Sequence, residues 1–207
     1  MGRRAGSFGV AAGFSMHPLK NFAVYGDGGF LTTNSEEIAK EVKLLRNHGL
    51  INRDAAIKWG FNSRLDSLQA GYALVKIKKL EELTVRYIEI ANLYSQNLTN
   101  KLKKPTTRKG CRDVFHNYVV SVDPKIRNLV MKRLLDYGIE TKIHYPIPLH
   151  LQDCARSLGY KPGDIPNTER LAKSMISLPI YPFLEREEID HVIYFLNKVV
   201  FEILGKE

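Results

Sequence analysis

The run Gly26-Asp27-Gly28-Gly29 constrains the fold of this chain strongly, because glycine adopts backbone conformations that other residues avoid. Around it, over residues 22–33, apolar and polar residues alternate as they do in strands. The segment therefore predicts two short strands joined by a tight turn. It is not expected to cradle a phosphate, because another strand, and not a helix, follows the glycines.

A helix is expected directly after this hairpin. Asn34 can cap its start, Glu37 is placed to return the bond, and Gly49 ends it. From Leu65 to Tyr94 apolar residues recur at helical spacing and predict one or two long helices. The last part of the chain is expected to form a strand at 114–122, a helix from Asp123-Pro124 to Gly138, a strand at 139–145 and a helix after Glu185 and Glu188.

Length and composition are those of a soluble globular protein, with 207 residues of which 44% are hydrophobic. No apolar run approaches the roughly 18 residues that a membrane-spanning helix needs, and no targeting segment is evident, so a cytoplasmic protein is expected. The two cysteines, Cys111 and Cys154, lie far apart and predict neither a disulfide framework nor a metal site.

The formal charge of +9 raises the alternative of a nucleic-acid-binding module, which would bind DNA or RNA in a salt-sensitive way. Basic residues are densest around residues 76–79 and 101–104. However, Glu81, Glu82 and Glu89 are interleaved on the same predicted helix. A solvated helix face explains this pattern better.

Several short motifs occur in a fixed order along the chain. They are Phe14-Ser15-Met16-His17-Pro18-Leu19-Lys20-Asn21, Arg46-Asn47-His48-Gly49, Gly60-Phe61-Asn62-Ser63-Arg64-Leu65-Asp66, Gln69-Ala70, His144-Tyr145-Pro146-Ile147-Pro148-Leu149-His150 and Ser177-Leu178-Pro179-Ile180-Tyr181-Pro182. In order and approximate spacing the chain resembles the DegT-type sugar aminotransferases, a branch of the fold type I pyridoxal-phosphate enzymes. The resemblance covers nearly the whole chain.

The resemblance implies an α/β fold corresponding to the C-terminal part of a fold type I transferase. Residues 1–75 would belong to the large cofactor-binding domain, and residues 76–207 would form a connecting helix and a small α+β domain. The family's acidic motif, whose aspartate pairs with the pyridine nitrogen, would precede the first residue of this chain. The chain is therefore expected to be a truncated product, half of a split enzyme or a mis-started reading frame.

Lys20 would be the Schiff-base lysine for pyridoxal 5′-phosphate and, once released, the base that moves a proton between substrate and cofactor. A lysine suits this role because a neutral amine must attack the cofactor aldehyde, and burial or a nearby cation can supply one. Ser15 would bond the cofactor phosphate, with a local turn cap as the alternative. Asn62 would reach the phosphate in the neighbouring subunit, with a helix cap as the alternative.

Arg64, His144 and Tyr145 would contact the sugar-nucleotide substrate, whose diphosphate favours a cation and hydrogen-bond donors. A helix-surface charge is the alternative for Arg64, and strand packing is the alternative for Tyr145. His144 and His150 could suggest a metal site, but no third ligand is evident, and none is expected.

The implied activity is transfer of an amino group, with glutamate as the expected donor, to a keto group on a nucleotide-linked sugar, as in polysaccharide biosynthesis. Lys20 argues against a related dehydratase that lacks this lysine. The expected partners are a second copy, forming a homodimer, or an N-terminal half. The main alternative is a non-catalytic remnant that pairs with a full-length relative.

Overall fold

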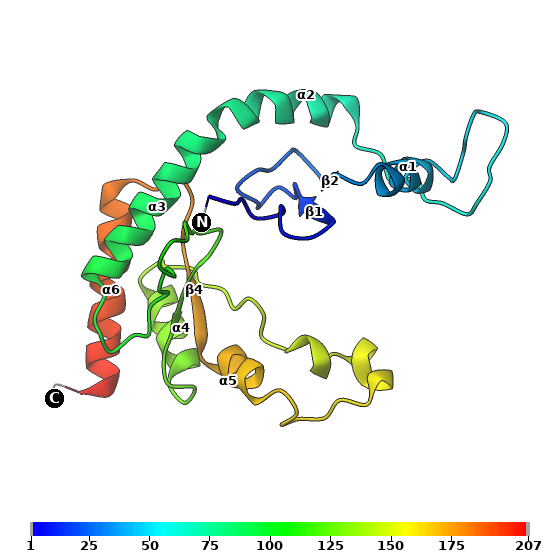
Figure 1. The fold of residues 1–207 in the computed structure, drawn as a ribbon. Helices are drawn as coiled ribbons and strands as arrows, with labels where there is room; N and C mark the ends of the chain where they lie inside the picture. Colours follow the sequence, from blue (N-terminus) through cyan, green and yellow to red (C-terminus); the bar gives the residue numbers. More distant parts are fainter. Residues whose placement is uncertain (1, 206–207) are drawn as a thin grey trace. The chain divides into compact units, whose positions relative to one another are not determined.

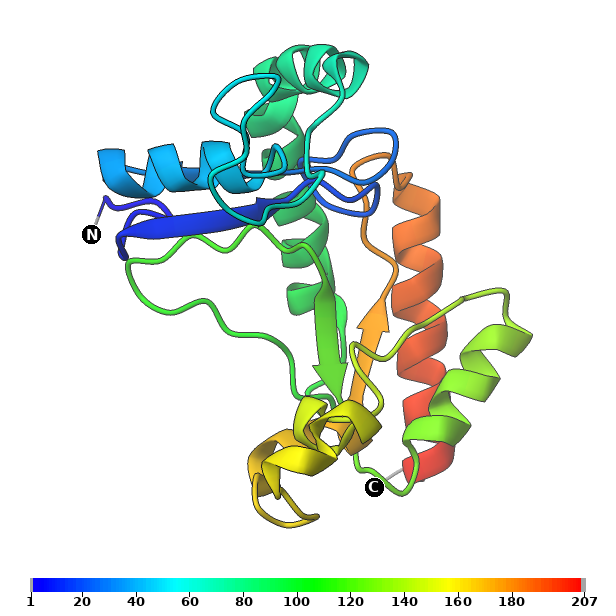
Figure 2. The same cartoon turned by 90° about the vertical axis from the view of Figure 1, so that its right-hand side faces the viewer.

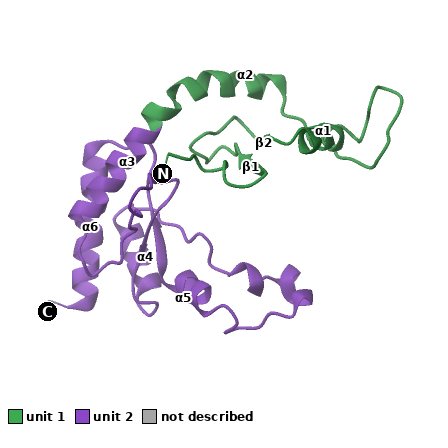
Figure 3. Cartoon of the chain, viewed as in Figure 1, with its two compact units in different colours: residues 1–83 green, residues 84–207 purple. Residues whose placement is uncertain are grey.

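The computed structural model describes residues 2–205. The chain divides into two compact units, residues 1–83 and 84–207 (Figure 3). Helix α3, Leu80–Asn97, runs through the division. The assignment of residues 1–75 to a cofactor domain stays a prediction.

Unit 1 begins with a two-stranded antiparallel ribbon (Figure 1). Strand β1, Ala11–Ser15, pairs with β2, Gly29–Thr33, so that Ser15 lies opposite Gly29. The prediction of a hairpin within 22–33 is wrong in its first half, because β2 pairs with 11–15 instead. The backbone N–H of Met16 donates to Gly28 O at 2.7 Å, and Val24 N–H donates to Met16 O at 2.9 Å, so residues 16–28 fold back as a loop.

Helix α1, Glu36–Leu45, follows the ribbon as predicted. Its cap is one residue later than expected, since Ser35 Oγ accepts from Ile38 N at 3.3 Å. The helix also ends before Gly49. Phe61 N–H donates to Leu45 O at 2.7 Å, so a distant segment takes one of the last helical carbonyls.

Two helices then confirm the long apolar period. Helix α2, Ser67–Lys76, is capped by Asp66, whose side chain accepts from Leu68 N at 2.9 Å. A single turn, η1 (Ile77–Lys79), joins it to α3. The buried core of unit 1 is small and consists of Met16, Val24 and Ala73, with Phe22, Leu65 and Tyr72 packed against it.

Unit 2 is built on a second antiparallel pair, β3 (Tyr118–Ser121) with β4 (Met175–Leu178). Figure 2 shows the helices of this unit beside the two strands. Helices α3, α4 (Arg127–Asp136) and α6 (Arg186–Leu204) supply most of the rest of its core, and the connecting segments supply the remainder. That core includes Ile90, Tyr94, Tyr118, Val120, Val130, Leu134, Ile176, Ile189, Leu196 and Val199. The Tyr94 hydroxyl donates to Pro179 O at 2.8 Å, which satisfies the polar end of a buried ring.

The connections of unit 2 carry shorter elements. The 3₁₀ turns η2 (Leu149–Leu151) and η3 (Asp153–Leu158) precede α5 (Pro166–Ser174), which leads directly into β4. Helix α5 and strand β4 were not anticipated from sequence. Helix α6 begins with the predicted Glu185 and Glu188, which form a reciprocal capping box.

Three predicted elements of unit 2 differ from the structure. The strand at 114–122 narrows to β3, and helix α4 starts at Arg127 because Asp123 first forms a turn, accepting from Lys125 N at 2.7 Å. The strand at 139–145 is wrong: Lys142 alone forms a bridge, to Ser177. Pro146 and Pro148 follow, and proline has no N–H with which to extend a ladder.

Candidate active site

The loop at residues 16–28 carries the predicted cofactor lysine. Lys20 N–H donates to His17 O at 2.8 Å, which forms a tight turn, and the Lys20 side chain is half-buried. Ser15, the last residue of β1, is exposed where this loop begins. The fold thus brings an amine and a hydroxyl to one loop at the end of the ribbon.

The Ser15 hydroxyl caps the local turn, as the alternative for this residue expected. Its Oγ accepts from His17 N at 3.2 Å. A hydroxyl has one donor and two acceptor positions, so this bond does not use its hydrogen. The amine of Lys20 and the hydroxyl of Ser15 therefore fit a cofactor that has both an aldehyde and a phosphate.

Gln69 on α2 fastens this loop to the helix, a role that sequence reasoning missed. Its Oε1 accepts from Tyr25 N at 2.9 Å, and its Nε2 donates to Tyr25 O. The Tyr25 and Tyr72 rings also pack with centroids 4.4 Å apart. The only sequence signal for Gln69 is its place in a short motif.

A mainly apolar pocket of about 530 Å³ lies beside Gln69. It is lined by Tyr25, Ser67, Leu68, Gln69, Gly71, Tyr72 and Val75.

A cluster of polar side chains in unit 1 joins the motif at residues 46–49 to the motif at residues 60–66. Arg64 Nε donates to Asn62 Oδ1 at 2.9 Å, and its Nη1 donates to Asn47 Oδ1 at 3.3 Å. Asn47 and Asn62 also form a backbone bridge. Close approach of the two motifs requires glycine, because a Cβ on Gly60 would lie 2.4 Å from Gly49 N.

This geometry removes the structural alternatives for two predicted residues. Asn62 does not cap α2, since Asp66 does. Arg64 precedes the helix and bonds to two asparagines, so it is not a helix-surface charge. Their contacts with a cofactor or substrate stay predictions.

In unit 2, His144 and Tyr145 are joined by a cis peptide bond. The His144 Nδ1 lies 2.8 Å from Ser177 Oγ. The Tyr145 side chain is 71% exposed, and strand packing is therefore wrong as an explanation for it.

His150 is buried and bonds to a different residue, Glu169 Oε1, at 3.2 Å. The two histidines of the motif thus have separate partners. Among residues 2–205, no three His, Cys, Asp or Glu side chains gather as metal ligands would.

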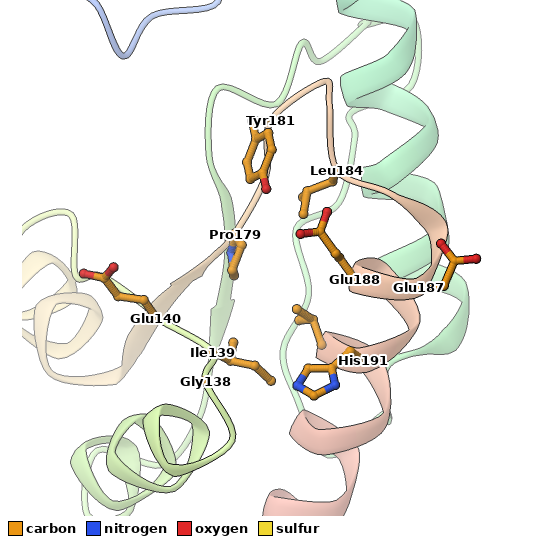
Figure 4. A pocket seen from close by; sticks show the side chains of 10 residues that line it. Gly138, Ile139, Glu140, Pro179, Tyr181, Leu184, Glu187, Glu188 and His191 are labelled. Carbon is orange, nitrogen blue, oxygen red and sulfur yellow. The ribbon is translucent and has the colours of Figure 1, made fainter.

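A pocket of about 550 Å³ in unit 2 contains none of the predicted site residues (Figure 4). Its rim is acidic, and three of its polar side chains have structural partners. Glu188 accepts from Glu185 N at 2.8 Å, Glu140 pairs with Lys142, and His191 Nε2 bonds Tyr137 O at 3.0 Å. These contacts explain why Glu188, Glu140 and His191 lie where they do without a ligand.

Every helix in the described range is too short or too polar to cross a membrane.

Comparison with known proteins finds similar sequences and similar solved structures. A dTDP-3-amino-3,6-dideoxy-alpha-D-galactopyranose transaminase of Aneurinibacillus thermoaerophilus is 38% identical over 198 residues, which are 95% of this chain and 53% of the relative. The solved structure of DesV from S. venezuelae, in complex with a ketimine intermediate, is 32% identical with a TM-score of 0.90, covering 95% of this chain and 53% of that one. NtdA from Bacillus subtilis, solved with bound cofactor PMP, is 29% identical with a TM-score of 0.87, covering 95% and 47%.

The chain thus spans about half the length of the relatives it matches. These comparisons confirm the resemblance inferred from the motifs, and they confirm the predicted pyridoxal-phosphate chemistry as that of the family. The α/β fold is that of the sugar aminotransferases. The family model matches residues 1–197, and the chain belongs to the DegT/DnrJ/EryC1/StrS aminotransferase family.

Proposed function

We propose that this chain supplies the covalent lysine and part of the substrate site of a pyridoxal-phosphate-dependent aminotransferase. The amino group passes from glutamate to a keto group on a nucleotide-linked sugar. The observation that supports this best is the loop at residues 16–28, which closes on itself through Met16 and carries Lys20, with Ser15 directly before it. The 95% of the chain that aligns with a dTDP-sugar transaminase supports the substrate class.

Pyridoxal phosphate, when bound, supplies an electron sink that weakens the C–H bond beside the substrate nitrogen. Lys20 would hold the cofactor through its Nζ and, once that nitrogen is released, would accept and return a proton there. Ser15 donates its hydroxyl hydrogen to the phosphate. The turn between His17 and Lys20 sets the backbone position of Lys20 in the loop.

Arg64 faces the substrate diphosphate in this proposal, because a guanidinium matches phosphate oxygens in shape and charge. His144 and Tyr145 contribute further hydrogen-bond donors from unit 2. Asn62 serves the cofactor phosphate of a neighbouring subunit in this proposal, so the active form is a homodimer. In domain terms the chain is the C-terminal part of a fold type I transferase.

Covalent labelling tests the central residue. The chain is incubated with pyridoxal phosphate, reduced with borohydride and digested, and the adduct is located by mass spectrometry. The adduct should lie on Lys20, disappear in Lys20→Ala and persist in Lys58→Ala, a matched change of an exposed lysine paired with Glu41. Labelling confined to other lysines contradicts the assignment.

Turnover tests the reaction. Glutamate and dTDP-linked keto sugars are assayed with the chain alone and with the N-terminal half of a relative supplied in trans. Turnover should appear in the assembled form, and mixing Lys20→Ala with Asn62→Ala subunits should restore part of it. A mixture no more active than either parent contradicts the shared site. Labelling of Lys20 without turnover in any arm contradicts the transferase assignment.

A further inference from the structure

The segment at residues 144–150 is held at both ends by its own histidines. At its start, His144 Nδ1 lies 2.8 Å from Ser177 Oγ on β4. At its end, His150 Nε2 lies 3.2 Å from Glu169 Oε1 on α5. Since α5 leads directly into β4, the two anchors stand on consecutive elements of unit 2.

Glu169 holds more than His150. The same carboxylate oxygen accepts from Gly163 N at 2.8 Å and from Ile165 N at 3.4 Å. It therefore joins both ends of the connecting segment at residues 150–165. The side chains of His150 and Glu169 are 5% and 13% exposed, so water competes little for the bond between them.

Burial of apolar side chains contributes little to holding residues 144–165 in place. From residue 144 to 165, which the structure describes throughout, Ala155 is the one hydrophobic side chain in the core. Ile147, Leu149 and Leu158 are instead 50%, 79% and 70% exposed. Polar anchors, and not packing, must then decide where this segment lies.

We propose that Glu169 and Ser177 are positioning residues which, through His150 and His144, hold segment 144–150 ready for the sugar nucleotide. The exposed Tyr145 lies between the two anchors, with its ring edge-on to His144 at 5.6 Å. A segment fixed before binding loses less conformational entropy when the substrate arrives. This role rests on the proposed function, because that function supplies the substrate.

Limited proteolysis tests the anchors without reference to the reaction. Trypsin can cut after Arg156, an exposed residue inside the connecting segment at residues 150–165. Glu169→Ala should speed this cut about tenfold, because it removes the acceptor of the buried His150 ring and of the Gly163 and Ile165 backbone N–H groups. The cleavage rate of Glu169→Gln, which keeps an acceptor oxygen, should lie between those of Glu169→Ala and the wild type. The control Asp136→Asn, at an exposed carboxylate of α4, should be cut at the wild-type rate. An unchanged rate in Glu169→Ala overturns the proposal.

Histidine ring ¹⁵N NMR separates the two anchors. Ser177→Ala should shift the ring signals of His144 and leave those of His150 unchanged, whereas Glu169→Gln should do the reverse. Far-UV circular dichroism equal to the wild type shows that each variant folds. Ring signals that do not respond to either change overturn the anchoring.

Substrate affinity tests the positioning role itself. Titration with a dTDP-linked amino sugar should give a Kd about tenfold weaker for Glu169→Ala and Ser177→Ala, while labelling of Lys20 stays the same. Glu169→Gln should restore part of the affinity. Equal affinities despite faster cleavage overturn the positioning role. Absence of binding by the wild type overturns the substrate assignment and this role with it, while labelling of Lys20 still decides the cofactor assignment.

Discussion

Unit 2 buries a continuous set of apolar side chains, whereas unit 1 buries few and relies on hydrogen bonds and glycines. In unit 2, Ile90, Ile176 and Leu196 are each fully inaccessible and come from three different elements. In unit 1 the buried cluster consists of Met16, Val24 and Ala73 with a few partly buried neighbours.

Like unit 2, unit 1 exposes some large apolar side chains, but it has a much smaller core beneath them. Trp59 is 98% exposed, Leu68 is 82% exposed and Phe61 is 70% exposed. Its site residues are held by polar contacts, such as those between Gln69 and Tyr25 and between Arg64 and Asn62. The comparison teaches that cavities should damage unit 2 most, whereas backbone clashes and lost polar contacts should damage unit 1 most.

The largest effect is expected from a cavity in unit 2. Leu196→Ala should lower the free energy of unfolding of that unit by about 3 kcal/mol, because a fully buried side chain is lost and the core collapses only partly. The matched change Leu68→Ala in unit 1 should cost less than about 0.5 kcal/mol. Native-state hydrogen exchange reads the two units separately. Similar losses in both would remove the contrast.

A backbone clash should be the next largest effect and should be confined to unit 1. In Gly60→Ala the new Cβ would meet Gly49 N at 2.4 Å, so the two motifs must separate, at a cost of about 2 kcal/mol. Exchange of the His48 amide, which donates to Phe61 O, should accelerate. The control Gly71→Ala meets nothing within 4 Å and lies inside α2, so it should be neutral or slightly stabilising. Unchanged exchange in Gly60→Ala would show that the motifs tolerate separation.

A smaller, pH-dependent effect should reveal the polar anchor in unit 2. The Gly163 backbone N–H is the main cause that holds the pKa of Glu169 below its usual range, with His150 adding to it against the effect of desolvation. A carboxyl with a lowered pKa stabilises the fold above its unfolded pKa, and this contribution is lost as the pH falls through the folded one. Glu169→Gln should therefore lower the Tm at pH 7, and the difference from wild type should shrink below the ordinary carboxyl range. A difference that is constant with pH would exclude a role for the charge.

The smallest effect is expected at an exposed ion pair of unit 1. Lys40 Nζ lies 2.9 Å from Glu36 Oε1, but the two side chains are 71% and 82% exposed. Glu36→Gln should change stability by less than about 0.5 kcal/mol, and salt should reduce the change further. Denaturant unfolding at low and high salt measures both. A loss comparable to that in Gly60→Ala would mean that polar contacts matter in unit 1 even when solvated.

The sequence by itself determined the helices at 67–97, the final helix α6 and the ordered motifs that carry Lys20, Asn62 and His144. These signals are local, because a cap or an apolar period acts over a few residues. The motifs also sufficed for the family, since their order is a property of the chain alone.

Tertiary structure decided the pairings between distant residues. The choice of 11–15 as the partner of β2, the bond from Gln69 to Tyr25, and the bonds of His144 to Ser177 and His150 to Glu169 all join segments far apart in sequence. No local rule specifies such partners, because each forms only after packing has brought the elements together. The sequence therefore predicted which side chains take part in the chemistry, and the fold decided which neighbours hold them in place.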